Sequence, residues 1–434
     1  MADGVAVAAA AVLVALAAVV GVYLKQRGVP VLAVAPPLQA RWLPHVGPGS
    51  VLAVVVAAAV VLRGPELAWR LGWRPLLSAG YLASVAWTSS LTLVDGWNRG
   101  VVNRLTTRTE YLSEVPGVTD IPRMLRTFTG GILSFQPDSW TTHVAGHPPG
   151  ALLTFVTLDR LGLSGGAPAG LLCILVGASA AVAVAVTLRA LGAEDAARAA
   201  LPFAVLFPGA VWVGTSADGL FAGVLAWGVA LLAVGATRSG PPGYLAALSG
   251  GVLLGASLYL SYGLVLGGLL PLAVLLATRR ARPVVLATIG AGAVVAAFTI
   301  AGFWWFEGYQ LVQVRYYQPG EYGARRPYGY WVWANLACLA IAVGPASVAG
   351  LRRLAAAPRR APRAVALLVA AAAVAVLAAD LSGLSKAEVE RIWLPFAVWL
   401  VAACAVLPAR GVRFWLASQA AVALAVNHLL LTTW

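Results

Sequence analysis

The chain has 434 residues, of which 60% are hydrophobic and only 11% are charged, and its formal net charge is +14. Because soluble domains carry about 25% charged residues, this composition excludes an ordinary soluble domain. The positive charge does not indicate a nucleic-acid-binding protein either, because the arginines lie in short loops between apolar runs, where the positive-inside rule places them.

Apolar runs close to the roughly 20 residues that cross a bilayer recur along the whole chain. We expect them at approximately 5–24, 47–62, 75–94, 148–163, 166–189, 198–213, 216–236, 243–262, 264–277, 284–303, 329–350, 365–379, 393–407 and 414–431. The first run follows no basic segment and is as long as a full span, so we expect a retained helix rather than a cleaved signal. The sequence therefore predicts an all-α polytopic protein of the plasma membrane with about 12–14 transmembrane helices.

Clusters of arginine indicate the sidedness of the chain. Three clusters mark cytoplasmic loops: Arg279, Arg280 and Arg282; Arg352, Arg353, Arg359, Arg360 and Arg363; and Arg410 and Arg413. They place 304–328 and 380–392 outside, and Arg63, Arg70 and Arg74 place 95–147 outside. Seven apolar runs then connect two external loops. Only an even number of crossings can do so, which means that one run does not cross; 148–163 and 264–277 are the shortest.

The N-terminal end gives conflicting signals. Lys25 and Arg27 favour the cytoplasm, whereas the crossing count from Arg63 puts them outside, and the larger arginine clusters support the second placement. We expect residues 1–74 to form additional membrane helices in front of a main transmembrane domain at 75–434.

The hydrophilic segment 95–147 contains five of the sixteen acidic residues of the chain. A loop of about fifty residues is usually functional and has some structure of its own. Helical spacing of apolar residues at 101–115 and again after Pro122 predicts two interfacial helices on the outer surface of the membrane.

Two of the four histidines fall in the stretch THVAGHPPGAL at 142–152. His143 and His147 have the spacing of two metal ligands on a helix, but Pro148 and Gly146 disfavour a helix between them, and no His-Glu-x-x-His pattern is present. If Pro148 or Pro149 begins a helix, His147 lies at or beside its N-cap and donates a hydrogen bond at an end that favours phosphate. A plain surface turn is the alternative.

Other polar residues stand at the boundaries of apolar runs. Asp95 ends the run at 75–94, and Asp218 begins the run at 216–236, where a carboxylate is costly unless it faces a cavity or a partner. The loop at 304–328 belongs to a stretch with twelve aromatics between Phe303 and Trp333, mixed with charged residues that include Arg325. Such a mixture suits sugar rings or isoprenoid units beside phosphate.

The third external stretch, DLSGLSKAEVERIWLPF at 380–396, gathers Lys386, Glu390 and Arg391 between two apolar runs. Arg391 is placed to bind a lipid phosphate at the membrane surface, and a salt-bridged loop is an equally good interpretation of the spacing. Each of Cys173, Cys338 and Cys404 lies inside an apolar run, which indicates neither a disulfide framework nor a cysteine metal site.

This order of features resembles the GT-C superfamily of membrane glycosyltransferases, especially its protein O-mannosyltransferase and aminoarabinose-transferase-like branch. The resemblance covers roughly 75–400 and includes the acid that closes an early helix, the long external loop, His-Pro-Pro-Gly at 147–150, an acid at Asp218 and a late arginine at Arg391. It implies a GT-C-like bundle that transfers a mannose-like sugar from a polyprenyl-phosphate donor to an acceptor hydroxyl on the extracytoplasmic face.

The resemblance also implies residue roles. Asp95 matches the catalytic base, and the His-Pro-Pro segment with His143, His147 and Pro148 matches the region near the donor phosphate. Asp218 and Arg391 match further substrate-binding positions, to which we add Arg325, Lys386 and Glu390 from the charged external loops. The family's usual Asp-Glu pair is Asp95-Gly96 here, so Glu110 and Asp120 are alternative bases.

The expected partners are a polyprenyl-phosphate-linked sugar, an acceptor that is lipid, glycan or protein, and the bilayer, with no nucleic acid. The pattern requires no cofactor, and a divalent cation such as Mg or Mn stays open. Two other functions compete with a glycosyltransferase: a lipid-linked saccharide transporter or flippase, and a non-catalytic membrane protein of envelope assembly. Transporters often contain internal repeats, and we find no convincing repeat in this sequence.

Overall fold

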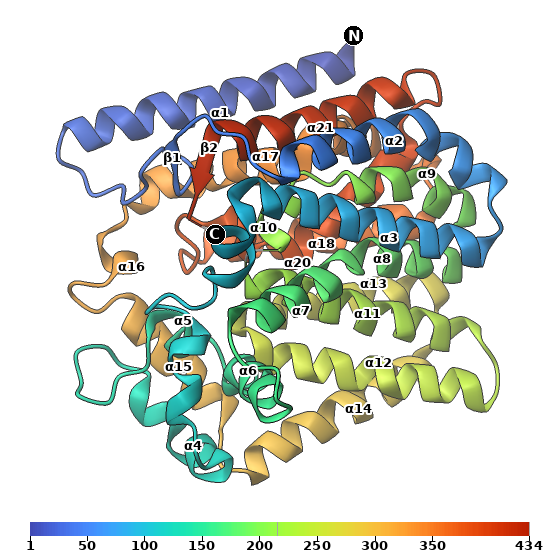
Figure 1. The fold of residues 1–434 in the computed structure, drawn as a ribbon. Helices are drawn as coiled ribbons and strands as arrows, with labels where there is room; N and C mark the ends of the chain where they lie inside the picture. The colour runs from blue at the N-terminus through green and yellow to red at the C-terminus, as the bar shows by residue number, and fades with distance from the viewer. Residues whose placement is uncertain (215, 434) are drawn as a thin grey trace.

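The computed structural model describes residues 1–214 and 216–433 and consists of helices packed side by side (Figure 1). Among these residues, nine helices are long and apolar enough to cross a membrane, and two shorter apolar helical stretches lie at Tyr262–Thr278 and Leu394–Val406. The expectation of an all-α multi-pass membrane protein is confirmed. The only sheet in the described part of the chain is a two-stranded antiparallel pair of β1 (Ala40–Trp42) and β2 (Leu430–Thr432).

The helices follow the apolar runs of the sequence closely. The longer ones are α1 (Ala2–Gln26), α2 (Gly49–Arg70), α3 (Trp73–Thr92), α6 (Pro149–Arg160), α7 (Gly166–Ala178), α8 (Ala180–Ala190), α9 (Glu194–Val205), α11 (Ala217–Thr237), α12 (Pro241–Leu260), α13 (Leu269–Thr278), α14 (Ala281–Ile300), α15 (Trp305–Tyr316), α17 (Tyr328–Ala356), α18 (Arg363–Leu381) and α21 (Val412–Leu429). The short ones are α4 (Ile121–Thr127), α5 (Thr142–Ala145), α10 (Ala210–Val213), α16 (Tyr322–Arg325), α19 (Val389–Ile392), α20 (Leu394–Leu400) and the 3₁₀ segments η1 (Leu93–Asp95), η3 (Tyr111–Ser113), η4 (Val115–Gly117), η5 (Phe128–Gly131), η6 (Tyr262–Gly268), η7 (Pro358–Arg360) and η8 (Val401–Val406), with a π-helical turn η2 (Trp97–Val102).

Helix α6 is one of the short helices that arise from the apolar runs between the external loops. It has 12 residues. At 1.5 Å per residue it is about 18 Å long, too short for the roughly 30 Å hydrocarbon core of a bilayer. The run at 148–163 therefore forms a helix too short to cross a membrane by itself, as do α9 with 12 residues and α13 with 10.

The loop at 95–147 is folded differently from the expectation at its start. Residues 101–115 form turns and the short segments η2 and η3 rather than an interfacial helix, so this prediction is wrong. Threonines at 106, 107 and 109 interrupt the helical pattern, since β-branched side chains with hydroxyls favour turns. Tyr111 is 2% exposed and packs into the core instead of facing lipid. The second expected helix is present as α4.

Helix α1 lies along α17, and its contacts link the N-terminus to one of the arginine clusters. Asp3 forms ion pairs with Arg352 at 3.1 Å and with Arg353, whose Nε donates at 2.8 Å. Because these arginines belong to a predicted cytoplasmic loop, the same prediction places the start of α1 in the cytoplasm and Lys25, at its other end, outside. The structure thus agrees with the larger arginine clusters, and α1 runs along the top of the bundle in Figure 1 toward the end where α5, α15 and α16 lie.

Close glycine packing and a buried glutamine hold helices together inside the bundle. Gly251 and Gly255 of α12 lie directly against Ala287 and Ala291 of α14, where a side chain would overlap the neighbouring backbone. Helix α17 is kinked at Gly344, whose φ is 78°. Gln419 of α21 satisfies the freed backbone there, because its Nε2 donates to the Val343 carbonyl at 2.9 Å and its oxygen accepts from the Ala346 N–H at 3.2 Å. Such repair is required where no water is present.

Candidate functional site

A cavity of about 390 Å³ lies at the external end of the bundle. Its wall comes from α5 and the turn after it, the start of η6, α15 and α16, the end of α18, and the segment up to α19. The charged and imidazole side chains of this wall are His143, His147, Arg315, Glu321, Arg326, Lys386, Glu388 and Arg391; the tyrosines are Tyr262, Tyr309, Tyr316 and Tyr322; the apolar part includes Val265, Leu266, Val312, Ala378, Ala379 and Ile392. A cavity with one charged and one apolar wall suits an amphipathic ligand.

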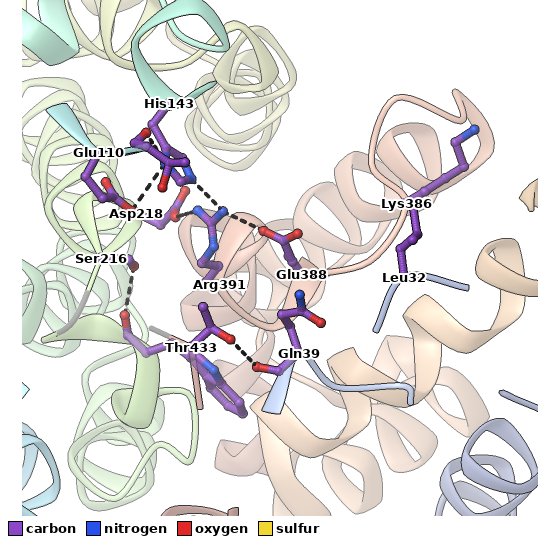
Figure 2. A network of polar contacts seen from close by, with 12 residues as sticks. Leu32, Gln39, Glu110, His143, Ser216, Asp218, Lys386, Glu388, Arg391 and Thr433 are labelled. Atoms are coloured by element: carbon purple, nitrogen blue, oxygen red, sulfur yellow. Dashed lines mark hydrogen bonds and ion pairs between the residues drawn. The ribbon is translucent and has the colours of Figure 1, made fainter. Parts of the chain in front are cut away.

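Arg391 is the centre of a buried polar network at this wall (Figure 2). Its guanidinium donates to the carboxylates of Asp218 at 2.7 Å and Glu388 at 2.8 Å, and it lies 3.1 Å from Nε2 of His143. Asp218 stands in the first turn of α11 and borders a recess of about 30 Å³ that shares Ile392 and other residues with the cavity. Because both partners are buried, removal of either Asp218 or Arg391 alone should cost about 3–5 kcal/mol.

The carboxylate of Glu388 links the guanidiniums of Arg326 and Arg391, and the backbone that positions it is strained. Ala387 and Glu388 have φ of 71° and 62°, a left-handed conformation that is uncommon for residues with a side chain and is often found at functional sites. The Glu388 carboxylate also accepts from Arg326 at 2.7 Å. Burial alone would raise the pKa of Glu388, but Arg326 and Arg391 outweigh burial and hold this pKa at about 2. Glu388 is therefore a permanent anion.

His143 connects Arg391 to a second buried acid. Its Nδ1 donates to the Thr109 carbonyl at 2.8 Å and lies 3.3 Å from Oε1 of Glu110. Because a carbonyl only accepts, Nδ1 carries the proton and Nε2 accepts from Arg391. Burial, aided by the charge of Arg391, lowers the pKa of His143 to about 3. Burial raises the pKa of Glu110 to about 8, so at neutral pH the histidine is neutral and Glu110 is mostly protonated.

His147 lines the cavity four residues further along. Its Nδ1 donates to the backbone carbonyl of His143 at 2.7 Å, so the neutral ring presents Nε2 as a lone pair. The rings of Tyr111 and Phe221 pack beside it, with centroids at 5.7 and 5.6 Å. Pro148 is the N-cap of α6 and is followed by Pro149, so the prolines begin a helix as expected. His147 thus donates its hydrogen bond to the protein backbone and not, as expected, to a group at the membrane surface.

Lys386 adds a cation further along the same wall. Its Nζ lies over the rings of Tyr317 at 4.9 Å and Tyr316 at 5.6 Å, and Figure 2 shows its side chain extending away from Arg391. Within the part of the chain that the structure describes, no carboxylate lies within ion-pair distance of this ammonium. Burial and the neighbouring Arg326 lower the pKa of Lys386. Lys386 is thus a cation without a counter-charge beside the cavity.

Asp95 lies outside the wall of the cavity. Its carboxylate accepts from His45 at 2.8 Å, from Arg99 at 3.3 Å and from Arg104 at 2.5 Å. Both arginines also donate to the carbonyl of Thr432 in β2. Asp95 therefore ties the start of the external loop to the C-terminal strand, and its carboxylate is occupied by these three basic side chains.

Three further expected site residues lie away from the cavity. Asp120 caps α4 by accepting the N–H of Arg123 at 2.9 Å. Arg325 is exposed at the end of α16. Glu390 is buried on the other side of α19 beside Cys338, and burial raises its pKa to about 7. Glu110 contacts the network through His143 but does not itself line the cavity.

The structure brings forward two residues that the sequence did not single out. Arg326, the neighbour of the expected Arg325, is 7% exposed, lines the cavity, and donates to the Lys386 carbonyl at 2.7 Å as well as to Glu388. Glu388 is one of several acids in the third external stretch. The strained φ that directs it into the network leaves no mark in the sequence, and only the tandem arginines hinted at Arg326.

No group of three or more His, Cys, Asp or Glu side chains within residues 1–214 and 216–433 is arranged to hold a metal ion. The pair of His143 and His147 does not share a centre, because the first uses Nδ1 on Thr109 and the second uses Nδ1 on His143.

No protein-family model and no curated protein matches the sequence. Among solved structures, the chain is similar to two of ArnT from Cupriavidus metallidurans, one in the apo state and one bound to undecaprenyl phosphate. For each, the identity is 19%, the TM-score is 0.46 and 77% of this chain is covered. The matched part spans 61% and 60% of the two ArnT chains. A likeness this low assigns no role to any residue, so function has to be inferred from the cavity itself.

Proposed function

We propose that the protein is a plasma-membrane glycosyltransferase that moves a mannose-like sugar from a polyprenyl-phosphate donor to an acceptor hydroxyl at its external face. The observation that carries this proposal is the cavity, because one wall is cationic and the other is apolar and aromatic. The sequence resemblance to the GT-C superfamily agrees with this function. The division into residues 1–74 and a GT-C-like domain at 75–434 is part of the same proposal.

The charged wall is suited to the donor phosphate. Arg326, Lys386 and Arg391 stand along it, and Nε of Arg326 is a buried donor without a hydrogen-bonding partner. A phosphate oxygen would satisfy such a donor, and a charge-assisted hydrogen bond of this type is about twice as strong as a neutral one. Glu388 and Asp218 already balance the charges of Arg326 and Arg391. Lys386 would therefore supply the positive charge that balances the phosphate.

The apolar wall is suited to the lipid tail and the sugar. Val265 is half exposed on η6 and lines the cavity together with Leu266 and Val312, so the apolar side extends to the outer surface of the bundle. Tyrosines at 262, 309 and 316 provide flat faces for isoprenoid units or a sugar ring. A ligand with a phosphate between a sugar and a polyprenyl chain matches this arrangement.

Two basic groups would assist departure of polyprenyl phosphate. The bond between the anomeric carbon and the phosphate oxygen breaks as the acceptor oxygen attacks, and negative charge develops on the phosphate. Fixed guanidiniums aimed at that position stabilise the transition state without reorganisation. Arg391 and Arg326 are held in place by Asp218 and Glu388, which makes them fixed in this sense.

A binding and turnover assay in nanodiscs with radiolabelled polyprenyl-phosphate mannose or glucose and an envelope acceptor fraction tests this function. We expect label to move to the acceptor. In the variant Lys386→Met, the apparent donor Kd should rise about tenfold, the equivalent of ~1.4 kcal/mol, because the ammonium is removed while an apolar chain stays on the tyrosine rings. Arg325→Met removes the same charge from an exposed neighbour and serves as the control, with an unchanged donor Kd.

The assay also separates the competing functions. Donor that is bound but never consumed, with label crossing to the other side of a vesicle, would favour a lipid-linked saccharide transporter. No binding of either donor would contradict the proposal and leave a non-catalytic membrane protein. Equal effects of Lys386→Met and Arg325→Met would show that only the general surface charge matters and that the cavity does not hold the phosphate.

A further inference from the structure

We propose that His147 is the general base of this transfer and takes the proton of the acceptor hydroxyl on its Nε2. This inference rests on the proposed function and adds a catalytic residue to it. It assigns to His147 a different role from phosphate binding, and it removes the need for a carboxylate base.

The carboxylates around the site are all unsuited to this task. Asp95 and Asp120 lie outside the cavity wall, and Glu110 is reached only through His143. Of the two carboxylates that line the cavity, Glu388 is held between Arg326 and Arg391. Glu321 accepts a short hydrogen bond from Ser134 and lies 3.7 Å from Arg315.

Asp218 is the remaining acid near the cavity. One of its oxygens is bonded to Arg391 at 2.7 Å, and the residue is 5% exposed. Asp218 is not among the residues that line the cavity, and Arg391 stands between its carboxylate and the cavity wall. Asp218 therefore acts on Arg391 rather than on the acceptor.

His147 has the geometry that these acids lack. Its ring lines the cavity and is partly buried, with one side bordering the open space. The proton on Nδ1 is fixed by the His143 carbonyl, and in the described part of the chain Nε2 has no hydrogen-bonding partner. Tyr111 and Phe221 pack against the ring and limit its rotation. An oriented imidazole with a free lone pair is the usual form of a histidine base.

The step balances with groups already named. The acceptor oxygen forms a bond to the anomeric carbon, and its proton goes to Nε2 of His147. The bond between the anomeric carbon and the phosphate oxygen breaks, and its electron pair stays on polyprenyl phosphate beside Arg326 and Arg391. The imidazolium then returns its proton to the departing phosphate or to water in the cavity, and the His143 carbonyl stabilises the charged ring meanwhile.

The surroundings of His147 keep it unprotonated between turnovers. Burial lowers its pKa from the ordinary histidine value, and the charge of Arg391 acts in the same direction, whereas Asp218 and the His143 carbonyl act against them. The neutral neighbour His143 adds no charge. A base with a lowered pKa loses activity only at pH values below the ordinary histidine range, because it is the protonated form that is inactive.

The test uses the full-length protein in nanodiscs with polyprenyl-phosphate mannose or whichever of the two donors is consumed. In His147→Ala, kcat should fall by about 10²–10⁴-fold, the range of general-base catalysis, while the donor Kd changes less than threefold. Added imidazole should restore part of kcat in proportion to its free-base fraction, and the acidic limb of the wild-type pH–rate profile should be absent from the variant. His428→Gln, in α21 and bonded to Ser50, is the histidine control and should keep wild-type kcat without any imidazole effect.

The outcomes distinguish the role of His147 as base from the proposed glycosyltransferase function. If the wild type transfers sugar but His147→Ala keeps its kcat, the base assignment is wrong and the glycosyltransferase stands. A loss of kcat in Asp95→Asn with donor binding intact, together with full activity of His147→Ala, would return the role to Asp95. If the wild type moves no sugar at all, the proposed function itself fails.

Discussion

At the scale of single residues, the charges buried at the site are balanced among themselves. Asp218 and Glu388 neutralise Arg391 and Arg326 in one connected network, and His143 is neutral within it. An ionised Glu110 would add a further negative charge, but burial raises its pKa to about 8 and so keeps it protonated at neutral pH. The network can hold two fixed guanidiniums at the cavity only as long as this balance is kept.

The protonation of Glu110 predicts how stability depends on pH. Because the folded protein keeps a proton that the unfolded chain releases above its ordinary pKa of about 4.5, the folded state loses stability as pH rises from there toward about 8. In Glu110→Gln this loss is removed, so thermal midpoints measured from pH 5 to pH 8 should fall less steeply than in the wild type. Glu307→Gln on the exposed start of α15 should keep the wild-type slope. An unchanged slope in Glu110→Gln would mean that Glu110 is ionised in the folded protein.

At the scale of elements, α1 does more than anchor the chain. Tyr330 of α17 donates to the Ala17 carbonyl at 2.8 Å, and Trp331 donates to the Val31 carbonyl at 3.3 Å. The segment after α1 continues to the site, where the Leu32 carbonyl accepts from Arg326 at 3.4 Å. Figure 2 shows Leu32 beside Lys386, with Gln39 of the same segment hydrogen-bonded to Thr433. The additional N-terminal helix therefore supports the cavity wall that carries Arg326.

Two glycines of α1 give a matched test of this support. A side chain at Gly21 would overlap Pro36 and the hydroxyl of Tyr330, whereas Gly4 has nothing within 4 Å. We expect Gly21→Leu to separate α1 from α17, lower the thermal midpoint and weaken donor binding severalfold through Arg326. Gly4→Leu adds the same side chain at an open position and should leave both quantities unchanged. Equal behaviour of the two variants would contradict a supporting role for α1.

At the scale of the whole molecule, arginine distribution and helix contacts give one consistent orientation. The ion pairs of Asp3 with Arg352 and Arg353 put the start of α1 in the cytoplasm, and the cavity then opens outside together with α15 and α16. The charge of the cytoplasmic loops opposes transfer of the chain in the other direction.

Labelling of introduced cysteines tests this orientation. All three natural cysteines are buried, so their background should be low. Gln26→Cys at the end of α1 should react with a membrane-impermeant maleimide on intact cells, whereas Arg360→Cys should react only after lysis. Both positions are exposed on the protein, so access is limited by the membrane alone. The reverse pattern would turn the cavity toward the cytoplasm and contradict an external transfer reaction.

Much of the fold could be predicted from sequence because the bilayer restricts it. The apolar runs correspond to helices, and the short run at 148–163 forms a helix that is too short to be a candidate span. The prediction of an interfacial helix at 101–115 was wrong, because the apolar residues of this segment are buried in turns against α6. The ring of Tyr111, for example, stacks on Phe155 with centroids 5.3 Å apart. Amphipathic spacing alone does not distinguish lipid from protein as the apolar partner.

The site was predicted less completely than the fold. His143, His147, Asp218, Lys386 and Arg391 do meet at one end of the bundle, since each stands at the external boundary of an apolar run. Asp95 stands at such a boundary too, but the arginines of its own loop hold it elsewhere.

The sequence by itself determined that this is a multi-pass helical membrane protein, because hydropathy acts locally along the chain, and arginine placement predicts which loops face outside. Only the tertiary structure decided which polar residues share a cavity and which are paired off. Ion pairs between residues as distant as Asp218 and Arg391, the strained backbone at Glu388, and the direction of an imidazole proton all depend on neighbours that folding brings together. A residue's chemistry at this site is set by those neighbours, and spacing in the sequence does not contain them.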